Sequence, residues 1–168
     1  NVCGGRKTVI DSPCKECEGS GLTQRTRKIT VRVPRGVENG SQLRLSGEGE
    51  AGMRGGPSGD LYIVLTIKPH PIFDRDGSDL LCETPITFSQ AALGAEVNVP
   101  TLLEGKARLK IPAGTQTGTV YRMRGRGMPS LHGYGRGDQL VRVVVRTPTK
   151  LSQRQRQILN EFSKEEWL

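Results

Sequence analysis

The chain has 168 residues, a formal net charge of +8, 34% hydrophobic residues, 4% aromatic residues and 22 glycines. This length and composition favour one or two small β domains with thin cores over one large core. The sequence shows no apolar run long enough to span a membrane and no signal-peptide pattern at Asn1, so we expect no membrane partner.

Residues 1–26 are rich in cysteine, glycine and charge, and they show little apolar periodicity. Cys14 and Cys17 form a complete CxxCxGxG motif, and Cys3 begins the tail of another such unit. Two thiolates with this spacing can bind one tetrahedral zinc ion from a tight turn, but a closed site needs four ligands. We therefore predict a partial zinc-finger module, with Cys14, Cys17 and Cys3 as metal ligands of incomplete sites.

From residue 28 onward the pattern predicts β-strands. Ile29, Val31 and Val33 alternate with polar residues, which is the period of two expected for a strand with one buried face. Pro85 must lie at an edge or a bulge, because proline cannot donate to the ladder. The predicted strands are residues 28–33, 43–45, 61–67, 80–88, 96–99 and 106–111, followed by those of a second repeat up to residue 145.

The sequence also predicts two helices. Ser89 can cap a short helix over residues 90–93. Ser152 and Gln155 have the spacing of a capping box at the start of a final helix. This helix would carry an apolar stripe that packs either on its own domain or against a second copy of the chain. The stripe consists of Ile158, Leu159 and Phe162, with Trp167 nearby.

One stretch of the chain, residues 31–67, occurs twice. A shift of 78 residues aligns it with residues 109–145 without a gap. Six of the nine identities are glycine, which indicates repeated turns and close backbone approaches. Two copies are too few for a solenoid, so we predict tandem domains of one fold. The identical positions are Pro34, Gly36, Gly40, Arg44, Gly47, Gly49, Gly55, Gly59 and Asp60 in the first copy.

The two copies differ in what precedes them. The second copy follows a strand, a helix and a strand, whereas the first follows only the Cys-rich segment. We therefore expect the opening strands of the first domain to lie ahead of Asn1. The expected fold is mainly β, with two tandem similar small β-sandwich domains, a partial Cys-rich module at the N-terminus and a C-terminal helix. The predicted boundaries are 1–26 for the Cys-rich module, 27–78 for the incomplete first β domain, 79–150 for the second β domain, and 151–168 for a helical dimerisation segment.

Together these motifs resemble the C-terminal part of DnaJ-type co-chaperones of the zinc-containing class. The resemblance covers essentially all 168 residues. It implies a fragment that lacks the J domain, because the His70-Pro71-Ile72 sequence is not the His-Pro-Asp motif of that domain. Its most specific parts are CKECEGSG, RLSGEGEAG, SGDLYIVLTIKPHPIFDRDGSDL, TFSQAALGAEVNVPTL and GTQTGTVYRMRGRGMP.

The resemblance implies a non-enzymatic co-chaperone of the stress response that binds unfolded or apolar client polypeptides and delivers them to a DnaK-type ATPase chaperone. It implies that this partnership depends on the missing J domain and nearby regions. It also implies a homodimer formed through the C-terminal segment, and a bacterial cytoplasm or an organelle matrix as the location. In the resembled family four CxxCxGxG units pair on two zinc ions, the first unit with the fourth and the second with the third. Cys14 and Cys17 match the fourth unit and Cys3 matches the third, so we expect zinc to be absent or incomplete in this chain.

The resemblance also points to client-binding residues. A shallow apolar groove beside a strand edge suits a protein that binds many sequences, because backbone pairing supplies affinity that does not depend on sequence. In the resembled family this groove lies in the first domain, and its pocket residues match Ile29 and Phe73. The alternative is that both side chains simply fill the thin core.

A redox function stays open on the sequence alone. Cys14 and Cys17 could form a thiol–disulfide pair, although the flanking Glu16 and Glu18 would raise the thiol pKa and no thioredoxin-like pattern follows. Cys82 lies in a strand pattern, so we expect a buried structural thiol there.

Nucleic-acid binding also stays open. The Cys-rich turn lies beside a basic stretch, but the ligand count and the scarcity of aromatic residues argue against a zinc knuckle. The basic stretch consists of Arg25, Arg27, Lys28 and Arg32.

Overall fold

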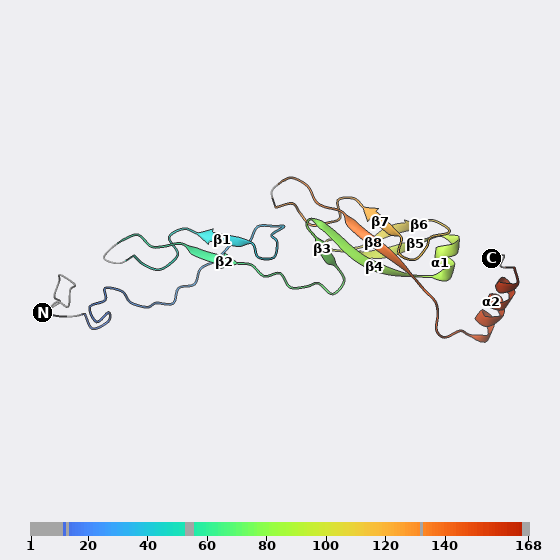
Figure 1. Cartoon of the computed structure of the whole chain (residues 1–168), viewed down its shortest axis with the longest axis horizontal. Coiled ribbons are helices and arrows are strands. Elements are labelled where there is room, and N and C mark those ends of the chain that lie inside the picture. The colour runs from blue at the N-terminus through green and yellow to red at the C-terminus, as the bar shows by residue number, and fades with distance from the viewer. Residues whose placement is uncertain (1–11, 13, 53–55, 132, 166–168) are drawn as a thin grey trace. The chain divides into compact units, whose positions relative to one another are not determined.

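The computed structural model describes residues 12, 14–52, 56–131 and 133–165. It divides into two compact units, Asn1–Lys68 and Pro69–Leu168 (Figure 1). The fold is mainly β, as the sequence predicts, with strands in both units and two helices in the second. Residues 69–78, which the sequence analysis assigned to the first domain, lie in the second unit. No helix within the described ranges is long and apolar enough to cross a membrane.

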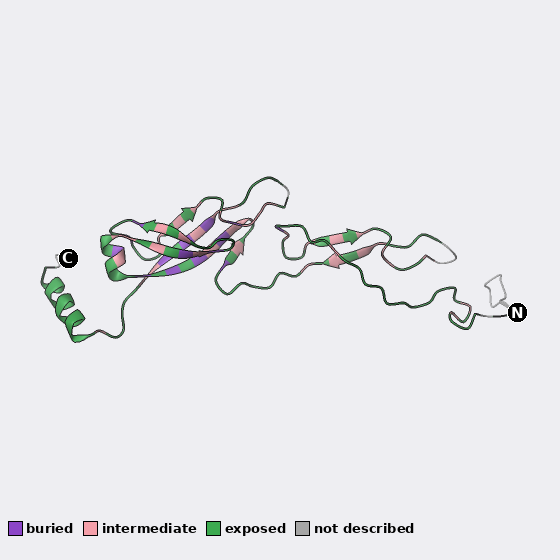
Figure 2. Cartoon of the chain, turned by 180° about the vertical axis from the view of Figure 1, so that it is seen from behind, coloured by how far each residue is buried: buried purple, intermediate pink, exposed green. Residues whose placement is uncertain are grey.

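The first unit contains a two-stranded antiparallel sheet made of β1 (Gln42–Leu45) and β2 (Leu61–Val64). Leu43 pairs with Ile63 across the ladder, so the two side chains share one face of the sheet. Their side chains are only half-buried, and Figure 2 shows no buried position in either strand. This sheet therefore has an apolar face that the described residues leave largely open.

The second unit is a two-layer β-sandwich. One layer is a four-stranded sheet in the order β3 (Asp74–Asp76), β4 (Asp79–Thr87), β8 (Gln139–Arg146), β7 (Val120–Met123). The other layer is the antiparallel pair β5 (Ala95–Thr101) and β6 (Gly105–Ile111). β4 and β8 run parallel, and the other pairings are antiparallel. The core between the layers contains Phe73, Leu80, Cys82, Ile86, Ala91, Val99, Ile111, Val141 and Val143.

Proline 85 lies where the sequence analysis expects it. Pro85 pairs with Val144 of β8 on one side, while β3 covers the other side of β4 only as far as Leu81. Beyond Leu81 that side of β4 is a free edge in the described structure. A missing N–H group costs no ladder hydrogen bond at such an edge.

The helices begin where local hydrogen bonds can cap them. The N-cap of α1 (Phe88–Leu93) is Thr87, whose hydroxyl accepts from the Gln90 amide at 3.2 Å while the Gln90 side chain accepts from the Thr87 amide at 3.0 Å. The prediction of Ser89 as this cap is therefore wrong, because Gln90 makes Thr87 the better capping box. The capping box predicted at Ser152 is confirmed at the start of α2 (Gln153–Glu165).

The predicted strand over residues 28–33 is wrong for the first copy. No strand is assigned there, although the equivalent residues form β6 in the second copy. In the second copy, β6 pairs with β5 along its whole length. The residues 78 positions ahead of β5 are 17–23, at the end of the Cys-rich segment, so the first copy has no β5 equivalent to complete this ladder.

The repeat itself is confirmed in three dimensions. Strands β1 and β2 lie 78 residues ahead of β7 and of the first half of β8. The cross-strand register is the same in both copies. The Gly40 amide donates to the Leu65 carbonyl at 2.8 Å, and 78 residues later the Gly118 amide donates to the Val143 carbonyl at 2.7 Å. One backbone frame is therefore built twice.

Candidate functional site

Each copy of the frame carries an arginine–aspartate clasp at the turn after its first strand. In the first copy Asp60 accepts from Arg44 Nε at 2.6 Å and from the Gly47 amide at 3.0 Å. In the second copy Asp138 pairs with Arg122 and accepts from the Gly125 amide at 2.7 Å. The sequence marked these positions as repeated, but only the structure shows that they contact one another.

The clasp controls the charge state of one carboxyl group. The Gly125 amide, followed by the Arg122 side chain, lowers the pKa of Asp138 below its ordinary value. Both partners favour the ionised carboxylate, because a hydrogen-bond donor and a cation each stabilise negative charge. Asp138 therefore acts as a fixed anion that holds the start of the Gly-rich loop.

The predicted client-binding residue Ile29 lies in the first unit and is 37% exposed. The same unit exposes Tyr62 and Val64 on β2, at 58% and 60%. In the second copy, by contrast, Val141 is completely buried, while its equivalent Ile63 in the first copy is only half-buried. The face of β2 that carries Ile63 is thus less covered than its equivalent in the second unit, whereas Tyr62 and Val64 lie on the opposite face, which is exposed.

The other predicted client-binding residue, Phe73, lies in the second unit and is only 7% exposed. It packs in the core with Leu80 and Val99. His70 fixes the preceding turn, since its Nδ1 atom accepts from the Ile72 and Phe73 amides at 3.2 and 3.3 Å. The buried position of Phe73 agrees with the alternative that its side chain fills the core. A client-binding role for Phe73 stays a prediction.

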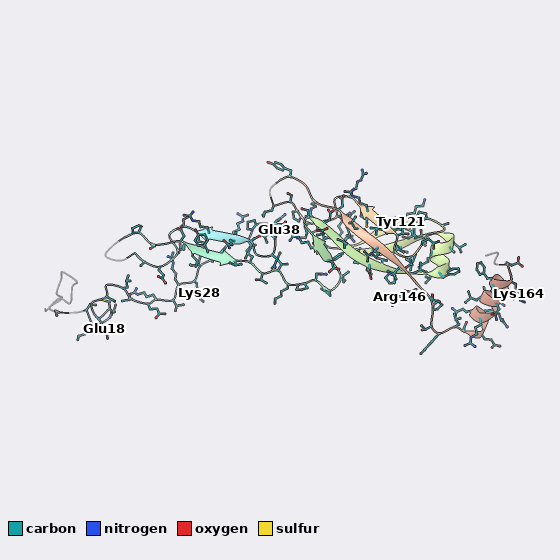
Figure 3. All side chains as sticks on the ribbon, in the orientation of Figure 1. Glu18, Lys28, Glu38, Tyr121, Arg146 and Lys164 are labelled. Carbon is teal, nitrogen blue, oxygen red and sulfur yellow. The ribbon has the colours of Figure 1, made fainter. Side chains whose placement is uncertain are left out.

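The Cys14–Cys17 segment is a tight turn (Figure 3, near the labelled Glu18). The Glu18 amide donates to the Cys14 carbonyl at 2.8 Å, and Glu18 has a φ of 50° in the left-handed region. The backbone amide of Glu16, followed by the amide and thiol of Cys17, lowers the pKa of the Cys14 thiol. The expectation that flanking carboxylates raise this pKa is therefore wrong for Cys14, because the Glu16 and Cys17 hydrogen bonds stabilise its thiolate and both glutamate side chains are exposed.

The described residues do not complete a zinc site. Cys14 is exposed and Cys17 half-buried, and both are free thiols. Nowhere in the described part of the chain do three or more His, Cys, Asp or Glu side chains gather in a way that could hold a metal ion. Cys3 lies outside the described residues. The turn therefore provides two preorganised thiols, half of what a structural zinc ion requires.

Two remaining expectations concern Cys82 and the basic stretch. Cys82 is buried, as expected, and burial raises the pKa of its thiol while the Gln139 side-chain amide donates to its sulfur at 3.2 Å. In the basic stretch, Arg27 is paired with Glu48 at 2.9 Å, and Lys28 is exposed (Figure 3). An ion pair within the unit reduces the positive field available to a nucleic acid.

Comparison with known proteins gives the same family in two ways. Residues 2–148 match the model of the DnaJ C terminal domain. The chain is 60% identical over 161 residues to the chaperone protein DnaJ of Desulfitobacterium hafniense (strain DSM 10664 / DCB-2), in an alignment that covers 96% of this chain and 42% of the relative.

Two other relatives bear the same name. The chaperone protein DnaJ of Halalkalibacterium halodurans is 55% identical over 161 residues, covering 96% of this chain and 43% of the relative. That of Acetivibrio thermocellus is 52% identical over 163 residues, covering 97% and 42%. The chain thus spans about two fifths of the length of these curated relatives.

Proposed function

The chain belongs to the DnaJ family, and from this premise we propose that it binds extended, apolar segments of unfolded polypeptides. The observation that carries the proposal is the open apolar sheet of the first unit. Tyr62 and Val64 are more than half exposed, and no residue of β1 or β2 is buried. Exposed apolar side chains beside a free strand edge suit the binding of an extended polypeptide.

Strand addition is the binding mode that suits this surface. An extended segment pairs with a free strand edge through its backbone, and its alternate side chains enter apolar pockets beside the edge. Two-stranded sheets have free edges on both sides, and β1 and β2 pair only with each other among the described residues. We assign Ile29 to this surface as an apolar wall residue, and Phe73, which lies in the second unit, is kept as a separate candidate.

The test is a binding titration with a fluorescent apolar peptide. Ile29→Ser should weaken peptide binding by about 1–3 kcal/mol, the usual loss when an anchor side chain is truncated. Ile67→Ser is a matched control, because Ile67 lies in the same unit and is 40% exposed, close to the 37% of Ile29. Equal affinity of the Ile29 variant and the unaltered chain, at equal melting temperature, would move the client site away from Ile29.

Delivery of the bound segment to a DnaK-type ATPase chaperone belongs to the same proposal, and family membership supports it. Peptide release from the chain should become faster when a DnaK-type chaperone, ATP and a J domain are added together. An unchanged release rate would restrict the proposal to peptide binding.

We also propose that α2 mediates homodimerisation. Its apolar stripe is exposed, with Ile158 at 50% and Phe162 at 48%, and the Phe162 ring meets the Phe88 ring edge-to-face with centroids 6.0 Å apart. A stripe of this kind suits a two-fold contact with a second copy. Light scattering should show a concentration-dependent dimer that Ile158→Lys weakens; a concentration-independent monomer would contradict this.

A further inference from the structure

The four-stranded sheet of the second unit has a second apolar face. Side chains alternate along a strand, so the residues that face the β5–β6 layer are followed by residues that face the other way. Leu80 and Val141 point into the core, whereas their neighbours Leu81 and Leu140 are half-buried on the outer face. Leu81 and Leu140 are direct partners across the β4–β8 ladder, so they form one continuous apolar patch.

A groove of about 570 Å³ lies over this patch. Its volume falls within the range of sites that bind organic ligands and side chains in other proteins, about 300–1,000 Å³. Ile72 and Val120 line it and are each 50% exposed. The groove lies entirely within the second unit, so it is distinct from the surface that contains Ile29.

The side chains that line the groove have a net negative charge, whereas the chain as a whole has a net positive charge. The charged residues that line it are Asp74, Glu83 and Arg142, two carboxylates and one guanidinium. Glu83 and Arg142 pair with each other at 3.6 Å, which leaves one carboxylate in excess. The chain as a whole has a net charge of +8, so this acidic excess is local. A ligand that complements the groove is therefore apolar with an adjacent positive charge.

We propose that this groove binds an extended polypeptide segment in which a large apolar side chain lies next to a lysine or an arginine. The apolar side chain packs on Leu81 and Leu140, and the neighbouring cation lies opposite Asp74. The proposal rests on the proposed function and adds a second polypeptide-binding surface with a stated sequence preference. A segment flanked by glutamate is disfavoured, because its charge repels the excess carboxylate.

The test uses two short fluorescent peptides with the same central Leu-Phe pair, one flanked by lysines and its twin by glutamates. The full chain should bind the lysine peptide more tightly. Leu140→Ser should weaken that binding about tenfold, because it truncates an apolar side chain that packs against the ligand. A tenfold loss of affinity corresponds to about 1.4 kcal/mol. Leu103→Ser is the matched control, because Leu103 is an exposed leucine of the same unit that does not line the groove.

Two further variants keep the test decisive. Val120→Ser changes a half-exposed wall residue, so it replaces Leu140→Ser if that variant melts early, and it should also weaken binding of the lysine peptide. Asp74→Asn should reduce the difference between the two peptides and leave affinity for the glutamate peptide nearly unchanged.

Equal affinity for both peptides, or unchanged lysine-peptide affinity in folded Leu140→Ser and Val120→Ser, overturns the inference. If Ile29→Ser then still weakens binding, the proposed function stands without this groove. If the unaltered chain binds neither peptide, the proposed function fails as well.

Discussion

At the scale of single residues, the arginine–aspartate clasp links local charge to the stability of the second unit. Asp138 is an anion held by the Gly125 amide and by Arg122, and both lower its pKa. A carboxyl whose pKa is lower in the folded than in the unfolded chain stabilises the fold above its unfolded pKa, about 3.9. This contribution is lost as the pH falls through the lowered folded value.

Asp138→Asn should therefore lower the melting temperature of the second unit at pH 7, and the difference from the unaltered chain should shrink as the pH falls toward 3. Melting curves recorded between pH 3 and 7 measure this. Asp60→Asn changes the equivalent clasp of the first unit and should leave melting of the second unit unaltered. A constant difference at every pH would show that the clasp acts through packing and not through charge.

A second residue-scale prediction concerns two equivalent glycines. A Cβ atom at Gly137 would lie 2.1 Å from the Ser78 carbonyl oxygen, whereas a Cβ atom at Gly59 would meet only the Glu50 oxygen, at 3.8 Å. Gly137→Ala should therefore destabilise the second unit by about 1–3 kcal/mol, the usual cost of overpacking, and Gly59→Ala should be tolerated. Urea unfolding measures both variants, and equal effects would contradict the close approach of Ser78.

At the scale of elements, the segment before β3 belongs to the core of the second unit. Phe73 packs on Leu80 and Val99, and β3 pairs with β4 immediately after it. The His70 ring lies 5.1 Å from the Phe73 ring and accepts two amides of the same turn. This turn therefore holds the phenyl ring against the sheet.

Phe73→Ala should destabilise the second unit by about 3–5 kcal/mol, because it removes a large side chain from a packed core. Phe73→Leu, which keeps most of the volume, should cost clearly less. Thermal and urea unfolding of both variants provide the measurement. If Phe73→Ala melts like the unaltered chain but loses peptide binding, then Phe73 serves the client site and not the core.

At the scale of the whole molecule, the two copies share hydrogen bonds but not burial. The Leu65 amide donates to Ser41 and the Val143 amide donates to Thr119, both at 2.9 Å. Val143 is completely buried, whereas Leu65 is half-buried beside an open sheet. Protection against hydrogen exchange depends on the free energy of opening, which comes mainly from packing.

We therefore expect the Leu65 amide to exchange with solvent at least tenfold faster than the Val143 amide, which corresponds to an opening free energy lower by about 1.4 kcal/mol. Hydrogen exchange followed by NMR measures both amides in one sample. Equal protection of the two amides would show that something covers the first sheet in solution.

Zinc binding also depends on the whole molecule, because a closed site needs four ligands brought together. Among the described residues only Cys14 and Cys17 are neighbouring thiols, and the third, Cys82, is buried in the core of the second unit. A monomer of this chain should hold no stoichiometric zinc, since two thiolates bind the ion weakly. Metal analysis after dialysis measures this, and Cys14→Ser is the control for residual binding. About one tightly held zinc ion per monomer would contradict the prediction.

The sequence by itself determined most of the local structure. The runs of apolar residues located β1, β2, β4, β5 and β6, and the 78-residue shift predicted one frame built twice, with β8 in the second copy. The spacing of Ser152 and Gln155 located the start of α2. These features depend on residues close together in the chain, or on a pattern repeated without a gap, so they can be read without tertiary contacts.

The tertiary structure decided which of those residues are covered. Residues 28–33 have the pattern of β6 but no β5 partner, and Phe73, for which the sequence left a groove and the core open, lies in the core of the second unit. Glu16 and Glu18 indicated a raised thiol pKa, while amides folded toward Cys14 lower it. In each case the outcome depends on a partner that the fold brings near or leaves absent. Alternation can show that a face is apolar, but what covers that face is decided only by the packing of distant segments.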